Sequence, residues 1–331
     1  MKEVLLVRSG HATLPDDELR GLPVTTSLEE ALREFRPHGV VVATPTAKHL
    51  EFALPAARAG AHLLLEKPVS DDLDGIAELT QVSREAGSRI LVGFQLRFDP
   101  GLEELRRLLG RGDLGKVVRA RVEWGEYLPH WHPWEDYRQG YAARNDLGGG
   151  VTRTLLHPFD YLAWLLGEVT EVQGFTGTLG DLELEVEDTC LANLRFASGA
   201  LASVELDYLR RPGRHQLEVV GTEGVARWWA EDASLEVEVA SSGSRESARS
   251  RWQPAEPFER NQLFLSEARH FLDVVVGAEP KCTLDDGARA LAVALGVRAS
   301  AEDGRRRRLD PSPAEAGAKT IHPREDSSRD G

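Results

Sequence analysis

The chain has 331 residues, of which 41% are hydrophobic and 28% charged, enough for two domains with cores and too polar for a fibrous or membrane protein. Its net charge of −14 argues against a general affinity for nucleic acid or anionic lipid. No apolar run approaches the roughly 20 residues that cross a bilayer, and no signal-peptide profile opens the chain, so we expect a cytoplasmic protein. Cys190 and Cys282 match no disulfide or CxxC spacing and are expected to be inert packing residues.

The first third of the chain alternates short apolar runs with helical patterns. Runs rich in Val, Leu and Ile suit strands buried on both faces, and they cover residues 4–7, 40–43, 62–65 and 90–94. Helical patterns lie between them at 28–35, 47–59 and 73–86, the first opened by a capping box of Ser27 and Glu30. This order predicts a parallel sheet covered on both sides.

From about Val117 the pattern changes to alternating strands joined by tight turns. Two hairpins of an antiparallel sheet are predicted, over 189–208 around Ser198-Gly199 and over 216–229 around 221–224. An amphipathic helix is predicted over 258–276, with apolar residues at 264, 265, 268, 271, 272 and 275, and a second helix over 285–297. We expect the residues after Gly304 to form a disordered tail, because they lack periodicity.

In an open parallel sheet, ligands bind beyond the carboxyl ends of the strands. At the second and third of those ends the sequence reads Ala-Thr-Pro-Thr (43–46) and Glu-Lys-Pro (66–68). Further on come Gly-Phe-Gln-Leu-Arg-Phe (93–98), then Leu-Gly-Gly-Gly (147–150) with His157 and Asp160 after it. Four motifs in this order resemble the Gfo/Idh/MocA family of nicotinamide-dependent sugar oxidoreductases, from residue 1 to about 300.

The resemblance implies an α/β plus α+β architecture. Residues 1–95 would form an incomplete Rossmann-type NAD(P)-binding domain, and 96–300 an antiparallel-sheet domain for substrate binding and oligomerisation, with the helix at 285–298 packing back on the first. Residues 304–331 would be the tail. The implied reaction is hydride transfer between NAD or NADP and a hydroxyl or carbonyl of a sugar, sugar acid or nucleotide sugar, in a homo-oligomer paired through the second-domain sheet.

Lys67 is, by this resemblance, the active-site lysine beside the nicotinamide and the oxidised carbinol, and Pro68 follows a cis peptide that aims it. Partial desolvation would suit this lysine to proton transfer or carbonyl polarisation, whereas an exposed lysine is the alternative. Thr44, Pro45 and His49 resemble the loop and helix start that pack on the cofactor, with a plain N-cap at Thr46 as the alternative. The residues assigned to cofactor binding are Arg8, Ser9, Thr44, Pro45, Thr46, His49, Glu66, Lys67, Pro68, Gln95 and Arg97.

His157 is the candidate general acid and base. Pro158 is expected in the first turn of a helix, which places His157 at the positive end of the helix dipole and favours a neutral ring. Asp160 is expected to orient His157. The alternative to a catalytic role is a structural histidine whose hydrogen bonds are made within the core. Many family members carry a carboxylate a turn earlier, where this chain has Thr154.

The stretch from Trp131 to Arg144 is dense in aromatic rings, which suit sugars, and in guanidinium forks, which suit carboxylates. We expect a substrate loop, with a packing or subunit contact as the alternative. The side chains of Arg97, Arg138, Arg144 and Arg153 predict an anionic substrate, unless they are ordinary surface arginines. The histidines at 130 and 132 lack partners at a usual ligand spacing, so no metal site is predicted. The residues assigned to substrate binding are Lys67, Tyr137, Arg138, Tyr141, Arg144, Arg153 and His157.

The GxGxxG turn that holds the pyrophosphate in dinucleotide folds does not occur near the start of the chain. Residues 4–7 with Arg8-Ser9 resemble the family's second strand and ribose contact, so the sequence indicates a start upstream or a decayed enzyme. We favour the truncated enzyme and expect this chain to bind NAD(H) and NADP(H) poorly. Arg8 in place of an acidic residue favours NADP slightly. The alternative function is a non-catalytic sugar-binding or scaffold protein that cannot hold a dinucleotide.

Overall fold

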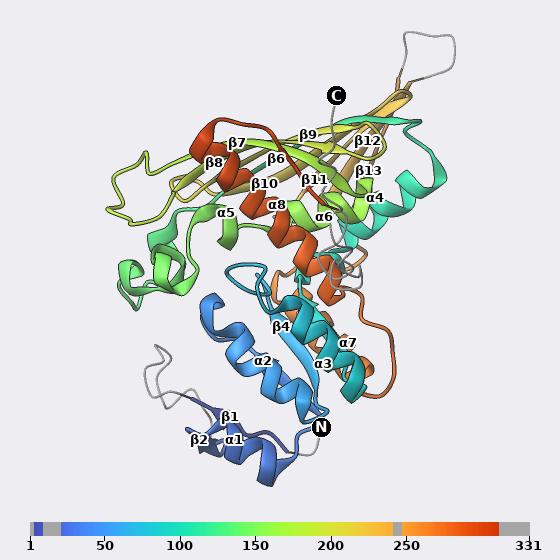
Figure 1. Ribbon diagram of the computed structural model, residues 1–331. Helices are drawn as coiled ribbons and strands as arrows, with labels where there is room; N and C mark the ends of the chain where they lie inside the picture. Colours follow the sequence, from blue (N-terminus) through green and yellow to red (C-terminus); the bar gives the residue numbers. More distant parts are fainter. Residues whose placement is uncertain (1–2, 9–20, 241–246, 311–331) are drawn as a thin grey trace, which may run out of the picture.

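Three parallel strands form the core of the first domain (Figure 1). In the computed structural model, which describes residues 3–8, 21–240 and 247–310, β3 (Gly39–Val42), β4 (His62–Glu66) and β5 (Ile90–Gly93) pair in that order. The middle strand is apolar on both faces, as the sequence predicts for a buried parallel strand. A separate parallel pair is made by β1 (Leu6–Val7) and β2 (Val24–Thr25).

Helices cover this sheet close to their predicted positions. The short α1 (Leu28–Glu30) begins at the predicted cap, where Ser27 Oγ accepts from the Glu30 amide at 3.2 Å. It continues as a wider π-helical turn, η2 (Ala31–Phe35). Downstream are the 3-10 turn η3 (Thr46–Lys48), α2 (His49–Arg58) and α3 (Ile76–Ala86), and α2 packs against α3.

The helix α7 (Asn261–Val275) also packs on β4 and β5, but with a different face from the predicted one. Phe264, Leu265 and Leu272 are 40–47% exposed, although the sequence pattern assigned them to the core. The buried face consists of Leu263, Glu267, Phe271 and Val274. The prediction was wrong because it counted apolar residues alone, whereas the buried stripe includes a carboxylic acid.

The second domain is built on a nine-stranded sheet with the order β13-β12-β11-β10-β6-β9-β8-β7-β14. The sheet is mixed, because β6 and β9 are parallel whereas the other neighbours are antiparallel. Both predicted hairpins are confirmed, β8–β9 and β10–β11. The strands are β6 (Val117–Gly125), β7 (Val169–Gly177), β8 (Thr189–Phe196), β9 (Leu201–Asp207), β10 (Arg214–Gly221), β11 (Gly224–Trp229), β12 (Ser234–Ala240), β13 (Ser247–Trp252) and β14 (Arg307–Arg308).

One face of this sheet packs on helices, and the other bears charged and apolar side chains. The buried face lies against α5 (Val151–Thr154) and α8 (Leu284–Asp303), and α6 (His157–Leu166) packs on α8 (Figure 1). The outer face carries cross-strand ion pairs such as Arg121–Glu205 at 2.8 Å. Exposed apolar residues stand among these pairs, as Phe175 beside Leu191 shows.

The linker between β6 and α5 holds four 3-10 turns, η5 (Leu128–His130), η6 (Tyr137–Gln139), η7 (Tyr141–Ala143) and η8 (Asn145–Leu147). The domains are joined by η4 (Gln95–Phe98) and α4 (Pro100–Arg111), and again by the start of α8. Gly287 approaches the first domain so closely that a Cβ there would lie 2.5 Å from Val69 Cγ1. The helix predicted at 285–298 therefore reaches the first domain through its first turns, while its later part packs on β7 and α6.

Residues 304–310 differ from the predicted tail, because Arg307–Arg308 pair with β7 as β14. Arg307 also forms an ion pair with Asp303 at 2.6 Å, which holds this segment to the end of α8. The remainder of the predicted tail, residues 311–331, lies outside the described residues. Within the described ranges, no helix combines the length and apolar character needed to cross a membrane.

Candidate active site

The carboxyl ends of β3, β4 and β5 bring predicted site residues to one edge of the first domain. Thr44, Lys67 and Gln95 follow the three strands in turn. Lys67 reaches from this edge to the second domain, where its Nζ donates a 2.9 Å hydrogen bond to the carbonyl oxygen of Thr154 in α5. The Lys67–Pro68 bond is cis, as expected. These residues therefore place the candidate site where the two domains meet.

His157 is the first residue of α6, and Pro158 occupies the first helical turn as predicted. The ring is 2% exposed and packs edge-on against Phe94, with 5.3 Å between ring centroids. Its Nδ1 is buried and has no hydrogen-bond partner in the described ranges 3–8, 21–240 and 247–310. Burial, and then the charge of Lys67, lowers the pKa of His157 well below its usual value, so the ring is neutral at pH 7. A neutral ring in this position is able to accept a proton.

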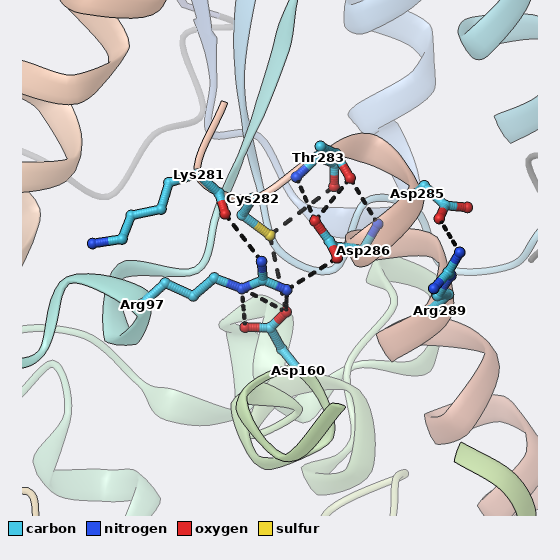
Figure 2. A network of polar contacts seen from close by, with 8 residues as sticks. All are labelled: Arg97, Asp160, Lys281, Cys282, Thr283, Asp285, Asp286 and Arg289. Atoms are coloured by element: carbon cyan, nitrogen blue, oxygen red, sulfur yellow. Dashed lines mark hydrogen bonds and ion pairs between the residues drawn. The ribbon is translucent and has the colours of Figure 1, made fainter. Parts of the chain in front are cut away.

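Asp160 binds Arg97 and not His157, which corrects two sequence assignments (Figure 2). The Arg97 guanidinium holds the carboxylate at two points, with Nη2–Oδ1 at 2.7 Å and Nε–Oδ2 at 3.0 Å. Both side chains are 4% exposed or less. Because these polar groups bind each other inside the protein, we remove Asp160 from the catalytic residues and Arg97 from the cofactor-binding residues.

The ion pair of Arg97 and Asp160 joins three parts of the chain. Arg97 lies in η4, Asp160 lies one turn after His157 on α6, and Arg97 also contacts Asp286 at 3.3 Å in the first turn of α8. A further bond runs from Arg97 to the carbonyl oxygen of Lys281 at 3.0 Å. Burial raises the pKa of Asp160, although Arg97 acts in the opposite direction. The pair fixes α6, and with it His157, against η4 and the first turn of α8, the segments that join the two domains.

Two residues that follow β3, His49 and Thr44, differ in their hydrogen bonding. The His49 ring contacts backbone carbonyl oxygens, whereas the Thr44 hydroxyl has no partner among the described residues. The His49 ring is 1% exposed and lies between the carbonyl oxygens of Thr44 and Pro68. Thr46 is also buried. Thr44 Oγ1 is buried and has no partner among the residues that the structure describes, so it is available to a ligand at this edge.

Glu267 is a buried group that the sequence analysis missed. Its side chain is 3% exposed, and its Oε1 has no hydrogen-bond partner. Burial, and then the neighbouring Glu66, raises the pKa of Glu267 to about 8, and burial also raises the pKa of Glu66. An acidic residue on the stripe formed by Leu263, Phe271 and Val274 was the available signal, and it was overlooked because the sequence pattern was built on the apolar residues at 264, 265, 268, 271, 272 and 275.

The arginines predicted to bind an anion all have partners within the chain. Arg97 is held by Asp160, and Arg138 pairs with Glu183 at 3.1 Å on the surface. The remaining two are Arg144, which pairs with Asp146, and Arg153, which is buried and donates to the carbonyl oxygen of Gly149 at 2.9 Å. They form no common cluster, so the observation behind the anionic substrate is lost.

The remaining residues predicted to bind substrate or cofactor lie in the linker before α5 and after β1. Tyr137 donates its hydroxyl to the carbonyl oxygen of Leu182 at 3.1 Å, and Tyr141 is partly buried. Arg8 follows β1, where its amide donates to the carbonyl oxygen of Thr25 at 3.0 Å, and Ser9 lies outside the described residues. In the parts of the chain that the structure describes, no three His, Cys, Asp or Glu side chains are arranged to hold a metal ion.

The nicotinamide end of a dinucleotide fits the edge formed by β3, β4 and β5. The donor set there comprises the unpartnered hydroxyl of Thr44 and the amine of Lys67, beside the buried side chain of Gln95. These are the residues that would hold the ring end of the cofactor.

Two family models match the chain, one over each domain. Residues 8–94 match the oxidoreductase family with an NAD-binding Rossmann fold, and residues 102–227 match the GFO/IDH/MocA C-terminal domain.

Curated relatives include oxidoreductases with named substrates. The chain is 28% identical to 1,5-anhydro-D-fructose reductase from Ensifer adhaerens, over 84% of this chain and 82% of the relative. It is 27% identical to myo-inositol 2-dehydrogenase from Thermotoga maritima, over 89% of each. An uncharacterized oxidoreductase from Synechocystis is 30% identical, over 60% of this chain and only 56% of the relative's length.

Solved structures share the fold. A levoglucosan dehydrogenase in complex with NADH and L-sorbose superimposes with a TM-score of 0.82 at 20% identity, over 94% of this chain and 90% of that one. The WlbA dehydrogenase from Bordetella pertussis, in complex with NADH and UDP-GlcNAcA, gives 0.70 at 24% identity, over 89% and 86%. With both domains matched and the same fold in these dehydrogenases, the chain belongs to the GFO/IDH/MocA family of NAD-binding oxidoreductases.

Proposed function

We propose that the protein is an NAD(P)-dependent oxidoreductase that interconverts a hydroxyl and a carbonyl on a neutral cyclic polyol or sugar. The observation that carries this proposal is the neutral, buried imidazole of His157 close to Lys67 at the carboxyl edge of the parallel sheet. A cationic amine and a neutral base are the two groups that proton handling at a carbinol requires. The named dehydrogenases among the relatives favour an enzyme over a non-catalytic scaffold.

Lys67 and His157 have separate roles when the substrate is oxidised. When bound, the oxidised nicotinamide supplies an acceptor for the hydride that leaves the substrate carbon. Lys67 Nζ orients the substrate oxygen and stabilises the negative charge that develops on it. His157 accepts the hydroxyl proton, so that the C–H and O–H bonds break together with formation of the carbonyl. Both groups are held in place by the second domain, Lys67 through Thr154 and His157 through the anchored α6.

The neutral substrate class follows from the charges around these two residues. The four arginines singled out in the sequence are bound to carboxylates or carbonyl groups, and Arg260, whose charge also acts on His157, is exposed at the start of α7, so we assign no arginine to a carboxylate or phosphate of the substrate. Trp131 is a donor in the linker: its buried Nε1 has no partner among the described residues, and its ring packs edge-on against Tyr208 at 5.6 Å. Aromatic rings and uncharged donors suit the faces and hydroxyls of a polyol ring.

A substrate panel tests this proposal. NAD⁺ and NADP⁺ are each offered with myo-inositol, levoglucosan and glucose, and with glucuronate and a UDP-sugar acid, at low and high salt. The cofactors are supplied at concentrations high enough to offset the weak binding expected of a chain without a GxGxxG turn. We expect turnover of at least one neutral ring compound with little salt dependence, because no charged contact is used. Exclusive use of the acidic compounds, weakened by salt, would contradict the neutral class, and absence of any turnover with either cofactor would contradict the enzymatic proposal.

A further inference from the structure

His49 connects two loops that meet at the candidate active site. Its Nδ1 lies 2.7 Å from the carbonyl oxygen of Pro68, and its Nε2 lies 2.9 Å from the carbonyl oxygen of Thr44. Thr44 follows β3, and Pro68 follows Lys67 at the end of β4. One buried ring at the start of α2 therefore spans the backbone on either side of the site.

The number of protons on the ring decides how many of these contacts are hydrogen bonds. A carbonyl oxygen only accepts, so each contact requires an N–H on the histidine. A neutral imidazole has one N–H, whereas the imidazolium has two. The shorter contact, from Nδ1 to Pro68, is the one that the neutral ring keeps, and the bond to Thr44 is completed when the second proton is added.

Burial is the main influence on this titration. It lowers the pKa of His49, the two carbonyl contacts act against it, and the charged groups that face the ring, Lys67 and Asp71, act in opposite directions. The net direction is downward, so the ring is neutral at pH 7 and donates to Pro68. The backbone that carries Lys67 is thus held at neutral pH, and the Thr44 loop is tied to it more firmly in acid.

We propose that His49 is a positioning residue that fixes the backbone of Lys67 through the carbonyl oxygen of Pro68. The proposal rests on the proposed function, because that function makes the position of Lys67 important. Lys67 Nζ is itself held by a hydrogen bond to the carbonyl oxygen of Thr154 in the other domain. Loss of the His49 bond frees the loop behind the lysine and loosens this contact.

Two substitutions separate the two contacts of the ring. The amide nitrogen of Asn lies close to the position of Nδ1, so His49→Asn keeps a donor to Pro68 and loses the one to Thr44. The amide nitrogen of Gln lies close to the position of Nε2, so His49→Gln keeps the donor to Thr44 and loses the one to Pro68. His38→Gln, at an exposed histidine outside this contact, is the control for the substitution itself.

The reactivity of the lysine amine reports its position without any need for turnover. The chain has six lysines, so acylation by sulfosuccinimidyl acetate can be followed at each of them by peptide mass spectrometry. In His49→Gln we expect acylation of Lys67 to rise roughly two- to tenfold, the factor that one lost hydrogen bond corresponds to, while Lys116 and Lys281 keep their wild-type rates. In His49→Asn and His38→Gln, the Lys67 rate should stay within about twofold of wild type, because the Pro68 bond remains.

Equal Lys67 rates in the wild type and His49→Gln, or the same rise in Gln and Asn variants, overturn the proposal. A second measurement uses the unaltered chain and so does not depend on the folding of a variant. In the ¹⁵N-histidine NMR spectrum we expect His49 to carry a slowly exchanging proton on Nδ1 at neutral pH and a second one on Nε2 in acid. A ring protonated on Nε2 alone at neutral pH overturns the assignment. Neither readout involves turnover, so a failure of the proposed function leaves these results distinguishable.

Discussion

Removing one member of the Arg97–Asp160 pair tests how α6 is held against the segments that join the two domains. Asp160→Asn leaves the guanidinium of Arg97 buried at 4% exposure without its main counter-charge, although the half-buried Asp286 at 3.3 Å and the carbonyl oxygen of Lys281 at 3.0 Å remain in contact with it. An uncompensated buried charge costs about 3–5 kcal/mol, a large part of a total stability of about 5–15 kcal/mol. Arg97→Met should cost a similar amount at pH 7, because it leaves the Asp160 carboxylate 2% exposed without its cation.

The double variant Arg97→Met/Asp160→Leu distinguishes loss of an ion pair from loss of packing. With both charges removed, we expect most of the stability to return, because buried pairs are often replaced by apolar residues at little cost. Arg138→Met is the exposed control, and loss of its surface pair with Glu183 should leave the urea midpoint close to that of the wild type.

Urea unfolding followed by circular dichroism measures these changes in the free energy of unfolding. Each change is calculated from the shift in the urea midpoint, provided that the dependence of the free energy on urea concentration stays constant. Single variants within about 1 kcal/mol of the wild type would refute the reasoning, since that is the scale of an exposed pair. A double variant that is less stable than both single variants would also refute it, because the cost would then lie in side-chain packing and not in the unpaired charge.

Three further predictions concern the site and the sheet. Replacing Lys67 by Met or His157 by Gln should lower kcat roughly 10²-fold or more in steady-state assays of any substrate found, and near wild-type turnover in either variant would remove that residue from the mechanism. Because burial raises the pKa of Glu267 to about 8, this carboxyl binds more protons in the folded chain than in the unfolded chain from about pH 5 to 8, and its contribution to stability falls as the pH rises. Urea midpoints should therefore fall less steeply over this range in Glu267→Gln than in the wild type, and parallel curves would contradict the assignment. The exposed Phe175 and Leu191 on the outer face of the sheet should be covered by a second copy of the chain. Light scattering at tens of micromolar should therefore give the mass of at least a dimer, and Phe175→Glu should weaken the association. A monomeric mass for the folded wild type would contradict this prediction.

Local patterns were sufficient for the elements that position Lys67 and His157. A buried parallel strand such as β4 is an unbroken apolar run, so its end, and the Glu-Lys-Pro that follows, is visible in the sequence. Pro158 likewise marks the first turn of α6 and places His157 at its start. Both features depend on residues next to each other in the chain, and sequence analysis finds such features readily.

The partners of the charged residues could not be predicted in the same way. Asp160 shares a helix with His157, so a local argument paired them, but its carboxylate is bound by Arg97, 63 residues earlier in the chain. That pairing depends on how η4 crosses α6, which no local periodicity encodes. Arg153 is a similar case, since its side chain turns back to the carbonyl oxygen of Gly149 and away from the predicted anion site.

The face of α7 was mispredicted for a related reason. Helical periodicity defines which residues share a stripe, but the choice between two stripes depends on the surface that receives the helix. Here β4 and β5 receive Phe271 together with Glu267, and the carboxyl is buried near Glu66 and Lys67. A count of apolar residues therefore left out Glu267, the residue of this helix that brings a further titratable group close to the site.

Direct hydride transfer is the central claim, and deuterium tracing tests it most directly. A ring-deuterated neutral polyol, C-deuterated myo-inositol in the first instance, is incubated with oxidised cofactor and the chain, and the reduced cofactor is analysed by mass spectrometry. The proposed function predicts one deuterium in the reduced nicotinamide with the wild type, and at least a roughly 10²-fold slower appearance with Lys67→Met. Reduced cofactor without deuterium, or an equal rate of labelling in the Lys67→Met variant, would contradict the account.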